Sequence, residues 1–97
     1  MDGKIVIYKA SSSNKSTQLY KALHGYTDRS NHGKYTYQRD GLLDEIPHRK
    51  VIKGVFILRK KDSQKFVDLL EKYEIEHYVR NIELMAEDEE ILSSSED

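Results

Sequence analysis

Basic and aromatic residues gather in the middle of the sequence, in a pattern that suits binding rather than catalysis. In β-sheets that bind RNA, exposed aromatic rings stack on bases while lysine and arginine contact phosphates. The segment 34–39 alternates tyrosines with polar and basic residues, and further basic residues precede and end an apolar run over 51–60. We therefore predict that nucleic acid or a partner protein binds at ten residues: Lys34, Tyr35, Tyr37, Arg39, Arg49, Lys50, Lys53, Arg59, Lys60 and Lys61.

The signature of RNA-recognition sheets is incomplete in this chain. That signature needs a glycine followed by a ladder of aromatic residues. The segment 53–58 reads Lys-Gly-Val-Phe-Ile-Leu, which has the glycine but not the ladder. Tyr35 and Tyr37 therefore have a second interpretation, as residues that pack in the core or cover the sheet in a dimer.

A phosphate-binding loop is poorly supported. Segment 10–17 lies between a predicted strand and a predicted helix, and Lys15-Ser16 imitates the end of such a loop. However, it lacks the glycines that let consecutive N–H groups wrap a phosphate. A cap on the helix is the simpler interpretation, and a weaker anion contact through free N–H groups and Lys15 is the alternative.

Catalytic and metal-binding patterns are also weak. Asp44 and Glu45 lie near His48 and would serve acid–base chemistry only beside a buried pocket. No serine lies in a Gly-x-Ser-x-Gly elbow, and cysteine is absent. The histidines lie in different predicted elements, without the spacing of a helical metal site: His24, His32, His48 and His77. We expect no catalytic residues, metal or cofactor.

Charge is divided sharply along the chain. Residues 85–97 contain no lysine or arginine, so all 16 basic residues and 11 of the 17 acidic ones lie in residues 1–84. An acidic tail on a basic body can occupy a basic groove, on its own body or on a partner, and repel nucleic acid from it. The plainer alternative is a solubilising terminus. The tail carboxylates are Glu87, Asp88, Glu89, Glu90, Glu96 and Asp97.

The elements that position these residues follow from hydrophobic spacing. Residues 4–10, 34–39, 51–60 and 75–84 have the composition of strands. Leu19 and Phe66 each begin an i, i+3, i+4, i+7 apolar series, which predicts helices that end near Gly25 and begin at Asp62. Segment 27–33 reads as a loop. Pro47 argues against a central strand over 42–50, so this segment is expected to be a connection whose Leu42, Leu43 and Ile46 lie against the core.

The resulting order, βαββαβ, predicts an α+β domain of the ferredoxin-like type over residues 1–84. In this arrangement a four-stranded antiparallel sheet carries two helices on one face. Residues 85–97 bury too little apolar surface to offset the entropy of ordering, so we expect a disordered acidic tail. The sequence shows no secretory signal and no run long enough to cross a bilayer, so we expect a cytoplasmic protein without membrane contact.

The layout and the tail Glu87–Glu90 with Glu96 and Asp97 resemble a small accessory subunit of a crenarchaeal B-family DNA polymerase holoenzyme. The charge-rich composition, typical of thermophiles, agrees with this. The resemblance implies an archaeal, non-catalytic protein whose body binds a DNA polymerase and whose tail restrains strand displacement during DNA replication. Two alternatives are a stand-alone RNA- or DNA-binding domain, and a small ligand-binding or enzymatic domain. A homodimer through the sheet is also compatible with the fold.

Overall fold

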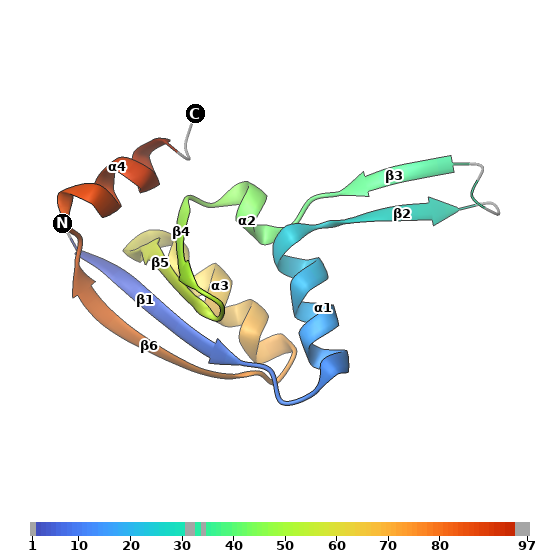
Figure 1. The fold of residues 1–97 in the computed structure, drawn as a ribbon, viewed down its shortest axis with the longest axis horizontal. Helices are drawn as coiled ribbons and strands as arrows, with labels where there is room; N and C mark the ends of the chain where they lie inside the picture. Colours follow the sequence, from blue (N-terminus) through green and yellow to red (C-terminus); the bar gives the residue numbers. More distant parts are fainter. Residues whose placement is uncertain (1, 31–32, 34, 95–97) are drawn as a thin grey trace.

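The computed structural model describes residues 2–30, 33 and 35–94, which form a mixed α+β structure (Figure 1). Four strands make an antiparallel sheet in the order β4-β5-β1-β6, two others make a separate hairpin, and four helices are present in this range. The elements are β1 (Asp2–Lys9), α1 (Ser13–His24), β2 (Tyr26–Ser30), β3 (Tyr35–Arg39), α2 (Leu42–Glu45), β4 (His48–Ile52), β5 (Val55–Arg59), α3 (Lys60–Lys72), β6 (Glu76–Glu83) and α4 (Ala86–Ser94).

The hydrophobic core lies on one face of the main sheet, between the strands and helices α1 and α3. Helix α1 begins after Ser12, whose side chain accepts a hydrogen bond from the N–H of Lys15, and ends at Gly25 with φ 82°, as predicted. Leu42, predicted to pack beside the core, does so. The buried members of the core are Val6, Leu19, Leu23, Leu43, Ile46, Phe56, Leu58, Phe66, Leu70 and Ile75.

The hairpin β2–β3, called the arm below, corrects the predicted role of residues 27–39. The predicted loop 27–33 contributes β2, and the predicted sheet strand 34–39 contributes β3, which pairs with β2 rather than with the main sheet. Figure 1 shows the arm projecting away from the other elements. Every β3 residue is exposed, so the alternating tyrosines do not reflect packing against the core.

The main sheet takes its outer strand from a segment predicted to be a connection. His48–Ile52 forms β4, directly after Pro47, at the edge of the sheet where a proline is tolerated. The predicted strand 51–60 is divided by a turn at Lys53 and Gly54 into the end of β4 and the whole of β5. Helix α3 begins at Lys60, and Asp62 does not cap it but accepts a hydrogen bond from Arg59 Nε at 2.6 Å.

The acidic tail is helical where the structure describes it, so the prediction of disorder is wrong for residues 86–94. Leu84 and Leu92 are buried although they lie outside the main core. Gly3 leaves the space that Leu84 occupies, since a Cβ on Gly3 would lie 2.5 Å from the Leu84 side chain. Asp88 is buried, pairs with Arg49, and accepts a hydrogen bond from the Met85 N–H at 3.0 Å. Glu96 and Asp97 lie outside the described residues.

Two leucines and an ion pair thus hold α4 against the sheet, and this attachment is testable. Removing the buried Leu92 side chain by Leu92→Ala should cost about 2 kcal/mol of local stability. Amide exchange in residues 86–94 should then be faster by more than about tenfold. Exchange in α3 should not change. Ile91→Ala, at a partly exposed position of the same helix, is the matched control. Equal protection of α4 in both variants would contradict this account of its order.

Candidate functional site

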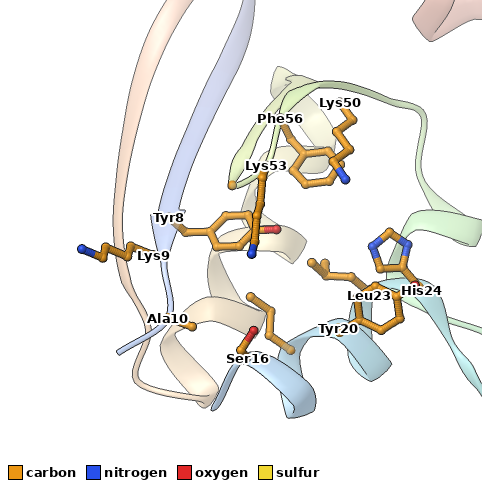
Figure 2. Close-up of a pocket in the computed structure, with 12 residues that line it drawn as sticks. Tyr8, Lys9, Ala10, Ser16, Tyr20, Leu23, His24, Lys50, Lys53 and Phe56 are labelled. Atoms are coloured by element: carbon orange, nitrogen blue, oxygen red, sulfur yellow. The ribbon is translucent and has the colours of Figure 1, made fainter. Parts of the chain in front are cut away.

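A cleft of about 530 Å³ opens between α1, the end of β1 and the β4–β5 turn (Figure 2). Its volume is typical of pockets that hold small ligands. The floor is apolar and aromatic, and the described lining contains basic side chains but no carboxylate. The lining residues are Tyr8, Lys9, Ala10, Ser16, Leu19, Tyr20, Leu23, His24, Lys50, Lys53, Gly54 and Phe56.

Tyr8 forms one wall of the cleft and joins it to the core. Its ring stacks on Phe56, with centroids 6.2 Å apart and planes 8° apart, and it also contacts Phe66. Burial raises the pKa of the Tyr8 phenol, so the group remains neutral over the physiological range. Tyr8 is therefore a rigid, uncharged surface in the cleft rather than an acid or a base.

The β4–β5 turn brings the lysines to the cleft. The Tyr8 N–H donates to the Gly54 carbonyl at 2.8 Å, which fixes the turn beside the end of β1. Gly54 has φ 83°, and a Cβ there would lie 2.6 Å from the Tyr8 carbonyl oxygen, so only glycine fits. Figure 2 shows the ammonium groups of Lys50 and Lys53 directed into the space facing α1, whereas the side chain of Lys9 points away from it.

Helix α1 forms the opposite wall with a polar stripe. Ser16, Tyr20 and His24 follow each other at intervals of four residues and so lie on one side of the helix. The rings of Tyr20 and His24 have centroids 4.5 Å apart. Tyr20 is 64% exposed, which leaves most of its surface open to a ligand.

The environment of His24 reports the positive field of the cleft. Its pKa is lowered, first by partial burial and then by the charges of Lys50 and His48, while Asp44 acts in the opposite direction. Asp44 itself accepts a hydrogen bond from the Gly41 N–H at 2.8 Å at the start of α2 and does not line the cleft. A negatively charged ligand in the cleft would relieve this field.

The predicted binding residues do not form one patch. Lys50 and Lys53 line the cleft, Tyr35, Tyr37 and Arg39 lie on the arm, and Lys34 lies outside the described residues. The remaining residues lie near α4. Arg49 pairs with Asp88 and with Glu87, the latter at 3.8 Å. Arg59, Lys60 and Lys61 line a second cavity of about 410 Å³ together with Asp2, Leu84, Glu89, Leu92 and Ser93.

Sequence reasoning missed the α1 wall of the cleft. The signal was the four-residue spacing of Ser16, Tyr20 and His24 beside the apolar series, a polar stripe that a helix places next to its buried face. The anion contact considered for Lys15 is not favoured, since its ammonium donates to the Glu74 carbonyl at 3.1 Å. No three His, Asp or Glu side chains of the described residues gather as a metal site would require.

Comparisons with protein-family models, with curated proteins and with solved structures find no match for this chain. Among the described residues, no helix combines the length and apolar composition needed to cross a bilayer.

The electrostatic coupling between Lys50 and His24 is measurable. Lys50→Ala removes a nearby positive charge, so we expect the pKa of His24 to rise. An NMR titration of the imidazole signals would measure it. Lys65→Ala removes the same charge from the exposed surface of α3 and should leave His24 unchanged. A His24 pKa that does not respond to Lys50→Ala would contradict the described geometry.

Proposed function

We propose that this protein is a non-catalytic module of nucleic-acid machinery that binds a single strand in the cleft. The observation that carries this proposal is the described lining, which brings Lys50, Lys53 and His24 together with the exposed ring of Tyr20 and includes no carboxylate. Lysines attract phosphates, and aromatic rings stack on bases, which is how proteins hold single strands with little sequence preference.

The size of the cleft favours a single strand over a duplex. A volume near 530 Å³ accommodates one or two nucleotides whose bases are unpaired. In the proposed complex, Lys50 and Lys53 contact successive phosphates and a base stacks on Tyr20, with His24 beside it. The Tyr8 and Phe56 rings provide the apolar floor.

A pair of matched double variants tests this proposal. Lys50→Ala with Lys53→Ala should weaken binding of a short single-stranded DNA or RNA about tenfold or more. It should also reduce the slope of log affinity against log salt by about 1.4, for two lost phosphate contacts. The measurement is fluorescence anisotropy at several salt concentrations.

Lys60→Ala with Lys61→Ala is the control, because it removes the same charge beside the second cavity. Loss of binding in this control but not in the cleft variant would place the site elsewhere. Absence of salt-dependent binding by the unmodified protein would exclude the proposed function.

The arm favours a second function, binding of a protein partner. The register of β2 and β3 places Tyr26, Tyr35 and Tyr37 on one side of the arm, and all three are exposed. The charge of Arg39 is paired with Asp28 at 3.2 Å, and its guanidinium lies over the Tyr37 ring. Tyrosine is enriched in protein interfaces, and an isolated two-stranded hairpin is only marginally stable in water.

We propose a DNA polymerase of the B family as this partner, in a holoenzyme whose access to DNA the protein modulates. The described tail carboxylates would act from α4, since Glu87 is largely exposed while it contacts Arg49. The ferredoxin-like assignment is part of this proposal. It is supported by the order β4-β5-β1-β6, with the arm and α2 as an insertion between α1 and β4.

Substitution of the arm tyrosines separates this second function from the first. Tyr35→Ala with Tyr37→Ala should abolish binding to the polymerase in surface plasmon resonance, because the variant loses two exposed rings but no core contact. Binding of single-stranded DNA by the free protein should be retained. Unchanged polymerase affinity would exclude the arm as the docking element.

A further inference from the structure

The face of the main sheet opposite the core has an apolar row across its middle and is only partly covered. Side chains alternate between faces along a strand, and directly paired residues of neighbouring strands share a face. The pairings of Val6 with Phe56 and Val79 define the core face. The other face, called the open face, carries the apolar residues Ile5, Ile7, Ile52, Val55, Ile57, Tyr78 and Ile82, together with the charged residues Lys9, Arg49, Arg59, Glu76 and Arg80.

One row of the open face is the most exposed. Ile52, Val55, Ile7 and Tyr78 are paired in turn across β4, β5, β1 and β6, so they form a line that crosses the whole sheet. Ile52 is 65% exposed, Tyr78 54% and Ile7 41%. Helix α4 contacts β4 and β5 and pairs with Arg49, and Leu84, just before the helix, lies against Gly3, so both lie away from this row. A continuous apolar line of this kind is typical of an interaction surface.

The β6 charges on either side of this row are opposite, so they could pair with the same charges of a second copy. Glu76, Tyr78 and Arg80 lie on the same face of β6, with opposite charges at equal distances on either side of Tyr78. Lys9 of β1 is paired directly with Glu76 on this face, and Arg80 donates to the Val79 carbonyl at 2.8 Å. A two-fold axis along the exposed row would stack two open faces with their strands antiparallel. Each apolar residue of the row would then meet its own copy, and Glu76 of each chain would meet Arg80 of the other.

We propose that the occupant of the open face is a second copy of this chain, in a two-fold symmetric dimer. Such an interface is isologous, in which the same patch serves both partners, and the arrangement of charge about Tyr78 satisfies this condition. Stacked sheets also bury apolar side chains from both inner faces. The inference does not depend on the proposed function, and it leaves the cleft open because Lys50, Phe56 and Tyr8 lie on the core face.

Sedimentation velocity at protein concentrations from about 1 to 500 µM tests the dimer, since a small interface gives micromolar affinity. The wild-type protein should shift from monomer to dimer across this range. Tyr78→Glu should raise the dissociation constant more than about tenfold, because it buries two like charges on the two-fold axis. Tyr35→Glu alters an equally exposed tyrosine of the arm and should leave the dimer intact.

Charge reversal distinguishes a symmetric dimer from other associations. Glu76→Arg alone and Arg80→Glu alone each place like charges opposite one another and should weaken the dimer. The double variant Glu76→Arg with Arg80→Glu restores opposite charges and should recover it. This comparison also serves if Tyr78→Glu fails to fold. The proposal would be overturned if the wild-type protein stays monomeric at the highest concentration. It would also be overturned if Tyr35→Glu abolishes the dimer while the Glu76 and Arg80 variants do not.

Discussion

The contacts of Tyr8 connect the core of this protein to its candidate site. The ring of Tyr8 packs against Phe56 and Phe66, which are both almost fully buried, while its N–H holds the β4–β5 turn through Gly54. The position of Lys53 therefore depends on the same packing that joins α3 to the sheet. Only glycine fits at position 54, so the backbone of the turn lies directly against the end of β1.

The main sheet is used differently on its two faces because of what covers each one. Helices α1 and α3 cover the core face, and the cleft opens where α1 leaves the end of β1. On the open face, α4 covers one end through Leu84 and Leu92, and the Arg49–Asp88 pair fixes its position. An ordered α4 means that the described tail carboxylates are held at a defined place on the body, and not on a free appendage.

The sequence predicted an element best where burial of one side imposes a regular spacing on the apolar residues. The apolar series in α1 and α3 and the β-branched segments of β1 and β6 predicted these elements, because each buries one side against the core. The segment of β2 has no apolar alternation, so it looked like a loop, whereas the alternating β3 was predicted as a strand but assigned to the wrong sheet. The turn at Lys53 and Gly54 was hidden inside an apolar run. The order of α4 comes from Leu84, Leu92 and a partner 39 residues before Asp88, contacts that acidic composition conceals. The cleft combines α1 with β4, which only the tertiary structure brings together.

The described cleft lining contains basic side chains but no carboxylate, and several carboxylates of the body have partners elsewhere. Asp44 is committed to the Gly41 N–H, Asp62 to Arg59 and Asp88 to Arg49 and the Met85 N–H, and each of these contacts stabilises a helix end or joins it to its neighbour. Burial and then the charges of Lys50 and His48 lower the pKa of His24, and Asp44 only partly opposes them. The proposed single strand would supply both groups that this lining can bind, since its phosphates would meet the lysines and its bases could stack on the ring of Tyr20.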